Sequence, residues 1–143
     1  MAHVSATIET WALSRRECLD HLAEAEVGRL MLSVNCLPVA RPVHLELREQ
    51  DLLAALGPDV DPSTVRNGNV VAIEVDGIAS RPTSTWVVTV TGIAEEFLDR
   101  PSGDPNLERL GWAAEAGLPM MRLSLKHIDG QWTDYGAVHI SSA

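Results

Sequence analysis

The side chains that most often perform chemistry in proteins occur in this chain without the spacing of a known catalytic site. No serine stands in a Gly-x-Ser-x-Gly turn, so a serine hydrolase of that type is not indicated. The histidines share neither His-x-His nor His-Glu-x-x-His spacing, so we expect no metal site. They are His3, His21, His44, His127 and His139. The sequence also identifies no catalytic acid or base.

Arginine is the residue type that is best suited to bind an anion in this chain. Ten of the 11 basic residues are arginine, so guanidinium groups and backbone amides must form any anion site. Arg41 is the strongest candidate, because it lies on the otherwise apolar face of a segment with period-two alternation. The alternative is that Arg41 pairs with Glu46 or Glu74 through a neighbouring strand. We interpret the acidic runs 46–49 and 95–96 as solvent-exposed faces.

The composition indicates a single domain over residues 1–143, with residues 1–12 as a flexible N-terminal arm. A net charge of −9 opposes attraction to phosphate backbones, which excludes nucleic acid as a partner. The chain has no apolar run of about eighteen residues and no signal-peptide core. We therefore expect a cytoplasmic protein with no membrane partner. Cys18 and Cys36 lack CxxC spacing, so both thiols are expected to be reduced.

Hydrophobic periodicity predicts an α+β chain that is mainly β. Ser14 and Glu17 form a capping-box pattern, which predicts a helix that ends near Ala25. Runs of strands with helices inserted between them favour an antiparallel sheet closed into a barrel. The predicted strands are 30–34, 39–47, 52–56, 69–76, 86–94, 120–128 and 135–140, with a short helical turn at 61–67 and a second helix over 104–117.

Four segments between residues 13 and 96 occur in an order typical of one family. They read LSRRECLDHLAEAEVGRLMLSV, LPVARPVHLEL, VVAIEVDGI and STWVVTVTGIAEE. Together they resemble the pyridoxamine 5′-phosphate oxidase-like family, the FMN-binding split barrels, and residues 122–130 add a weaker similarity. The resemblance implies a six-stranded antiparallel split β-barrel with flanking helices. It also implies a homodimer with two equivalent flavin sites at the subunit interface, for which Trp112 and Trp132 are the candidate interface pair.

The resemblance also implies cofactor-binding positions. Arg41 would hold the FMN phosphate, and Arg66 stands where the family often contacts it. The alternative for Arg66 is an arginine that faces the C-terminal dipole of a short helix. Trp86 would wall the ring pocket or the dimer interface, or it is simply a core residue. Thr85 and His44 would hydrogen-bond the flavin or a substrate, and simple surface exposure is the alternative for both. The complete set is Arg41, His44, Ser63, Thr64, Arg66, Thr85 and Trp86.

The chain departs from the family pattern at the phosphate position. Where flavin-binding members carry a lysine, this chain has Asp59 and Asp61, and two carboxylates repel a phosphate dianion. Val87 and Gln131 replace a serine and an arginine of the family words. Ser63 and Thr64 would have to serve as neutral donors, with Arg66 supplying the charge.

These observations support three hypotheses of function. The first is an FMN-dependent oxidoreductase of unknown substrate, in which hydride transfer occurs at the flavin N5. The second is the same dimer with an eroded flavin site, which acts as a ligand-binding or protein-binding module. The third is a reductase that uses the deazaflavin F420, whose longer anionic tail would require a larger basic groove.

Overall fold

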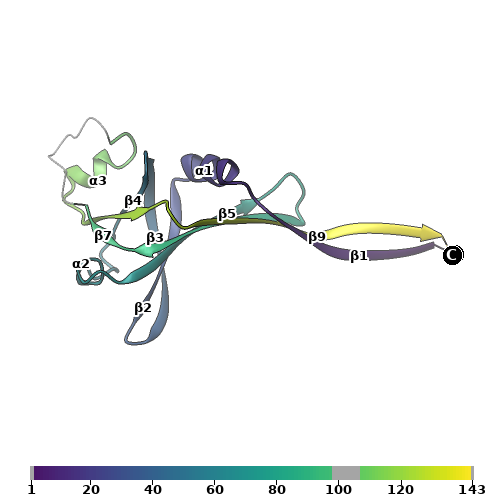
Figure 1. Ribbon diagram of the computed structural model, residues 1–143, viewed down its shortest axis with the longest axis horizontal. Helices are drawn as coiled ribbons and strands as arrows, with labels where there is room; N and C mark the ends of the chain where they lie inside the picture. Colours follow the sequence, from purple (N-terminus) through teal and green to yellow (C-terminus); the bar gives the residue numbers. More distant parts are fainter. Residues whose placement is uncertain (1, 98–106, 143) are drawn as a thin grey trace.

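The computed structural model describes residues 2–97 and 107–142, and within these ranges it contains nine strands and three helices. A long two-stranded ribbon projects from the body of the molecule (Figure 1). In chain order the elements are β1 (Ala2–Ala12), α1 (Arg15–Glu24), β2 (Val27–Val34), β3 (Leu37–Arg48), β4 (Asp51–Ala55), α2 (Ser63–Arg66), β5 (Val70–Ile78), β6 (Ser84–Ile93), β7 (Glu95–Glu96), α3 (Gly111–Glu115), β8 (Met120–Ser124) and β9 (Ile128–Ser142).

All nine strands belong to one sheet in the order β1-β9-β6-β5-β2-β3-β4-β8-β7, and every neighbouring pair is antiparallel. The mainly β, antiparallel prediction is confirmed. The prediction of six strands closed into a barrel is wrong, because in the described residues the outer strands β1 and β7 do not pair with each other. The extra strands lie at the edges. A two-residue strand such as β7 is too short to produce an alternating pattern.

The ribbon consists of β1 and the outer part of β9. The two strands pair from Ala2↔Ser142 to Ala12↔Gln131, with a register shift between Thr7 and Glu9. At the base of the ribbon the ring centroids of Trp11 and Trp132 lie 3.7 Å apart. Trp132, predicted for a subunit interface, therefore contacts its own chain. Residues 2–12, expected as a flexible arm, are paired along their length with β9.

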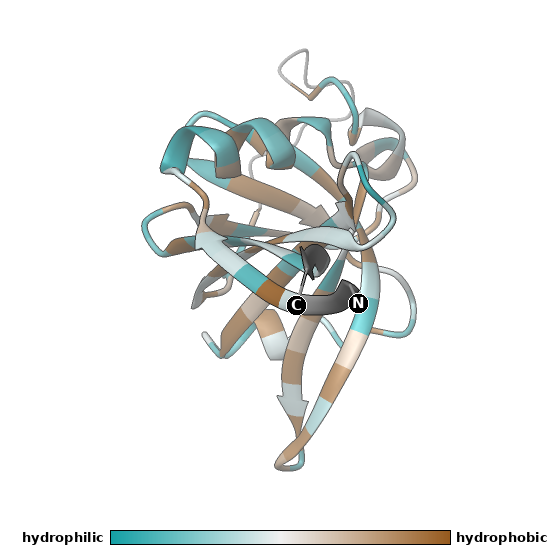
Figure 2. Ribbon diagram, turned by 90° about the vertical axis from the view of Figure 1, so that its right-hand side faces the viewer, coloured by the Kyte–Doolittle hydropathy of each residue, from teal (hydrophilic) through white to brown (hydrophobic). Residues whose placement is uncertain are grey.

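Helix α1 begins where the capping-box pattern predicts. The backbone N–H of Glu17 donates to Ser14 Oγ at 3.1 Å, and the backbone N–H of Ser14 donates to Glu17 Oε1 at 3.0 Å. Cys18 and Leu22 are its buried residues, whereas its outer surface is hydrophilic (Figure 2). The prediction of this helix is confirmed, because both the cap and the apolar face are local features of the sequence.

Strand β4 separates two hydrophobic clusters. Leu52 and Ala54 belong to the main core, whereas Leu53 and Ala55 pack with Phe97 and the segment that carries α3. The continuous apolar run of β4 is what a strand covered on both faces requires.

Two predictions in this region need correction. The second helix is only Gly111–Glu115, and its expected start at 104–105 falls outside the described residues; the expected strand 120–128 is interrupted between β8 and β9.

The two cysteines differ in exposure, which predicts different reactivity. Cys18 is buried, and burial raises the pKa of its thiol, whereas Cys36 is exposed at the β2–β3 turn. Because the thiolate is the reactive form, we expect a disulfide reagent to label Cys36 readily in the native protein and Cys18 only after unfolding. The number of protein thiols that react before and after the addition of guanidinium measures this difference. Equal labelling rates in the native protein would contradict the assignment.

Candidate functional site

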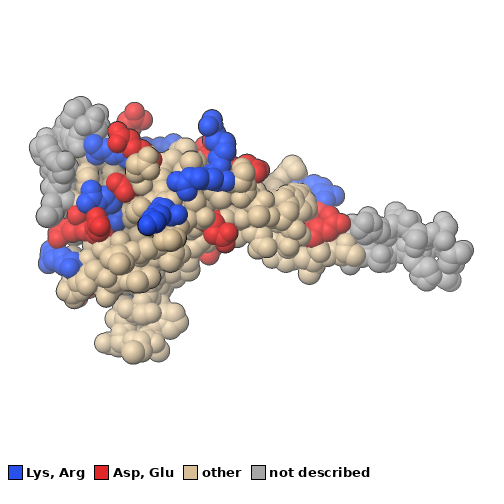
Figure 3. Space-filling model, viewed as in Figure 1, with Lys and Arg blue, Asp and Glu red and all other residues tan. Residues whose placement is uncertain are grey.

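The cavity that brings together three of the seven predicted residues, more than any other described cavity, lies between the β2–β3 hairpin and the segment that carries α2. Its volume is about 360 Å³. Leu32, Val39 and Val60 supply apolar wall, and the rim is polar. The hairpin projects from the body, and residues 30–40 contain no charged side chain (Figure 3). One wall of the cavity is therefore an uncharged β-hairpin.

Arg41 lies at the mouth of this cavity because of its place in β3. Alternation puts it on the face that buries Val43 and Leu45, near the end of the strand where the core opens to solvent. Its guanidinium Nε lies 3.7 Å from Asp59 Oδ2, and both side chains are close to half exposed. The predicted pairing with Glu46 or Glu74 is therefore wrong. Glu46 is buried elsewhere, and Glu74 pairs with Arg29.

The start of α2 places Ser63 and Thr64 in the same cavity. The Asp61 carboxylate accepts the backbone N–H of Ser63 at 3.0 Å, and the Thr64 hydroxyl donates to the Asp61 carbonyl. The Ser63 N–H holds the pKa of Asp61 below its usual range, so this carboxylate is ionised at neutral pH. Asp59 and Asp61 against Arg41 give the lining residues a net charge of −1. Asn67 and Asn69, which the sequence analysis did not single out, add side-chain amides to the rim.

Four predicted residues lie away from this cavity, and the first of them is Arg66. It stands in the last turn of α2, as predicted, but it does not line the cavity. Its Nε lies 3.5 Å from Glu96 Oε1 on β7. An ion pair between exposed side chains of this kind contributes little to stability. Arg66 therefore supplies no charge to the cavity in this conformation.

Thr85 and Trp86 line a different cavity, of about 490 Å³, on β5, β6 and β9. The Trp86 ring stacks on His21 of α1 with a centroid distance of 3.7 Å and an interplanar angle of 15°. A Cβ at Gly77, the β5 partner of Trp86, would lie 2.8 Å from the ring, so only glycine leaves room for it. Trp86 therefore packs α1 against the sheet and also lines this cavity.

His44 lies on the other face of β3 from Arg41, because the two residues are three positions apart. Its ring meets the Trp112 ring edge-on at 5.0 Å. Of the seven predicted residues, Arg41, Ser63 and Thr64 thus line the cavity beside the β2–β3 hairpin, and Thr85 and Trp86 line another. Within the described ranges, no group of three or more His, Cys, Asp or Glu residues is arranged to hold a metal ion. No helix there is long and apolar enough to cross a membrane.

Comparison with known proteins gives a consistent family and fold. The sequence profile described as pyridoxamine 5′-phosphate oxidase matches residues 14–112. The protein Rv0080 of Mycobacterium tuberculosis, which is uncharacterised, is 34% identical over 96 residues, which cover 64% of this chain and 63% of that protein.

Among solved structures, an FAD-binding protein of Mesorhizobium loti superposes with a TM-score of 0.73 at 21% identity, covering 89% of this chain and 98% of its own. The FAD-binding protein of Mycobacterium smegmatis superposes with a TM-score of 0.61 at 19% identity, covering 87% and 98%. At this identity the superpositions show a shared fold. They show it over most of both chains.

Proposed function

Because the chain belongs to the pyridoxamine 5′-phosphate oxidase family, we propose that it is a flavin-dependent oxidoreductase with FMN in the cavity beside Arg41. The observation that carries this proposal is that Arg41 of β3 and the adjacent residues Ser63 and Thr64 of α2 line one cavity. A guanidinium and two hydroxyl-bearing side chains are donors of the type that a flavin phosphate requires. The names of the structural relatives, which include FAD-binding proteins, agree with a flavin nucleotide as the ligand.

The charges of the cavity test whether FMN fits. Asp59 holds Arg41 in an ion pair that is open to solvent, and such a pair stabilises a protein by only about 0–1 kcal/mol. A hydrogen bond between a guanidinium and a phosphate contributes about 1.5–3 kcal/mol. The bond to the phosphate is therefore stronger than the ion pair that it replaces, but the two nearby carboxylates each oppose it by about 1 kcal/mol in a water-like dielectric and offset most of that gain. The residues fit FMN, with an affinity lowered by Asp59 and Asp61.

In this proposal the flavin supplies hydride transfer at N5, and the protein supplies binding and orientation. Arg41 holds the phosphate, the Ser63 hydroxyl donates to one of its oxygens, and the apolar wall excludes water from one side. The Thr64 hydroxyl donates to the phosphate only after its hydrogen bond to the Asp61 carbonyl is broken. F420 is the less favoured cofactor, since Arg41 is the only cation among the described residues that line the cavity. We further propose a homodimer in which a second copy covers residues 30–40, the uncharged end of the β2–β3 hairpin, where Leu37 is 66% exposed.

A binding measurement tests the proposed function. We expect the purified protein to be yellow, or to gain thermal stability when FMN is added, since ligand at 100 times its Kd stabilises the native state by about 2.7 kcal/mol. Sedimentation at micromolar concentration is expected to show a species of twice 15.5 kDa.

Colourless protein that gains no stability from excess FMN would contradict the proposal. It would favour a binding module with an eroded flavin site. The Arg41–Asp59 pair is the observation on which that second candidate depends.

A further inference from the structure

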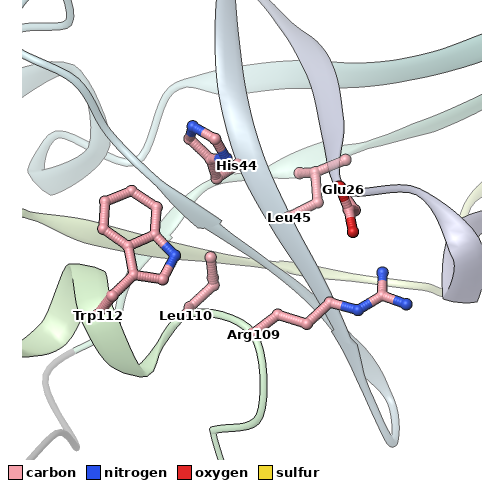
Figure 4. A pocket seen from close by; sticks show the side chains of 6 residues that line it. All are labelled: Glu26, His44, Leu45, Arg109, Leu110 and Trp112. Carbon is pink, nitrogen blue, oxygen red and sulfur yellow. The ribbon is translucent and has the colours of Figure 1, made fainter.

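A third cavity lies where His44 of β3 faces α3 (Figure 4). It shares no lining residue with the Arg41 cavity. Its volume is about 250 Å³. Leu45 and Leu110 are buried and contribute its apolar surface, and the other lining residues are Glu26, His44, Arg109 and Trp112. Because pockets for drug-sized ligands start at roughly 300 Å³, this cavity suits a ligand of one ring or two fused rings.

The wall that carries Arg109 and Trp112 is anchored to β3 by a buried carboxylate. Glu46 is 5% exposed and accepts the backbone N–H groups of Glu108, Arg109 and Leu110. The Arg109 guanidinium donates one N–H to the carbonyl of Ala25 at 3.0 Å, which ties this wall to the end of α1. The cavity is therefore already formed without a ligand.

The polar groups of the cavity lie on one side and its aromatic rings on the other. Figure 4 shows the Arg109 guanidinium and the Glu26 carboxylate on the same side, and Trp112 and His44 across from them. A guanidinium has five N–H donors, and among the described residues the Arg109 guanidinium donates to the Ala25 carbonyl alone. Several donors thus remain for a carboxylate of a ligand. Glu26 can accept an N–H from the same ligand.

We propose that this cavity binds a small aromatic carboxylate that carries an amino group on the neighbouring ring carbon. The carboxylate pairs with Arg109, the amino group donates to Glu26, and the ring lies against Trp112. Figure 4 shows Arg109 and Glu26 on the same side of the cavity, so the two polar groups of the ligand must lie on the same side of its ring, and we assign them to neighbouring carbons. The site is separate from the proposed flavin site, so the inference does not depend on flavin binding.

Titration calorimetry on the full-length, flavin-free protein tests the ligand class. The probe is 2-aminobenzoate, and benzoate and aniline are its matched controls, since each lacks one of the two polar groups. We expect 2-aminobenzoate to bind, with benzoate and aniline each at least about fivefold weaker, because each leaves one charged group of the site without its hydrogen bond. No heat from 2-aminobenzoate at millimolar concentration, or equal affinity for all three compounds, would overturn the proposal.

Variants locate the binding within the protein. Arg109→Ala is expected to weaken 2-aminobenzoate about tenfold or more, and Trp112→Phe about twofold to fivefold while keeping an aromatic ring. Arg16→Ala is the control, because Arg16 is exposed on α1 and pairs with Asp20. Circular dichroism establishes that each variant is folded. Equal affinity of the Arg109 and Arg16 variants for 2-aminobenzoate would place any binding elsewhere. Repeating the titration with FMN present keeps this result separate from that of the flavin experiment.

Discussion

Replacement of Glu46 by alanine is expected to lower the free energy of unfolding by about 3–5 kcal/mol. The Glu46 carboxylate is buried and accepts the backbone N–H groups of Glu108, Arg109 and Leu110 at 3.2, 2.5 and 2.9 Å. A buried donor left without an acceptor costs about 1–3 kcal/mol, and this substitution leaves three donors without their acceptor. Urea denaturation followed by circular dichroism measures the change.

Two further variants separate this hydrogen-bonding role from the loss of a charge. Glu46→Gln keeps one acceptor oxygen, so its destabilisation is expected to be about half that of Glu46→Ala. Glu115→Ala removes an exposed glutamate from α3 and is expected to change stability by less than about 0.5 kcal/mol. Faster hydrogen exchange at Leu110 in the Glu46 variant would locate the damage. A Glu46→Ala protein as stable as the Glu115→Ala protein would show that the segment is held by its apolar contacts instead.

The elements predicted correctly are those whose signals are local. The cap at Ser14, the short helix between Pro62 and Asn67, and the alternation in β3 each depend on neighbours within a few residues. The edge strands and the buried role of Glu46 depend on distant partners. Glu46 lies in an acidic run and bonds to a segment more than sixty positions away. Nothing in its own surroundings in the sequence marks it as buried.

The candidate site was predictable to a similar extent. Arg41 was identified because a charged side chain on an apolar strand face must bind either an anionic ligand or an acidic side chain. The acidic side chain is Asp59, which lies in the loop between β4 and α2. His44 was grouped with Arg41 through the family resemblance, although strand alternation places the two side chains on opposite faces. Trp86 was predicted to wall the ring pocket or to lie in the core, and its stacking partner His21 could not be predicted, because it comes from a helix that only tertiary packing brings near.

Opposite effects on FMN affinity are expected from the two members of the ion pair at the cavity. Arg41→Ala is expected to weaken FMN by about 1.5–3 kcal/mol, or roughly tenfold to a hundredfold, since it removes a charged hydrogen bond to the phosphate. Asp59→Asn is expected to strengthen FMN by roughly threefold to tenfold. It removes the competitor for the guanidinium and one repelling carboxylate, each of which opposes binding by about 1 kcal/mol or less. Flavin fluorescence quenching measures both affinities.

The double variant shows whether Asp59 acts through Arg41 or directly on the phosphate. If its main effect is to hold the guanidinium, Asp59→Asn gains little in the Arg41→Ala background, and the two changes are not additive. If direct repulsion dominates, the gain persists in that background and shrinks as salt is added, because the groups are exposed and screened. Arg122→Ala, which breaks an exposed ion pair with Glu95 on another part of the sheet, controls for the loss of an arginine as such. Among the described residues that line the cavity, Arg41 is the only cation. An Arg41→Ala protein that binds FMN as tightly as this control would therefore exclude Arg41, and with it this cavity, as the phosphate site.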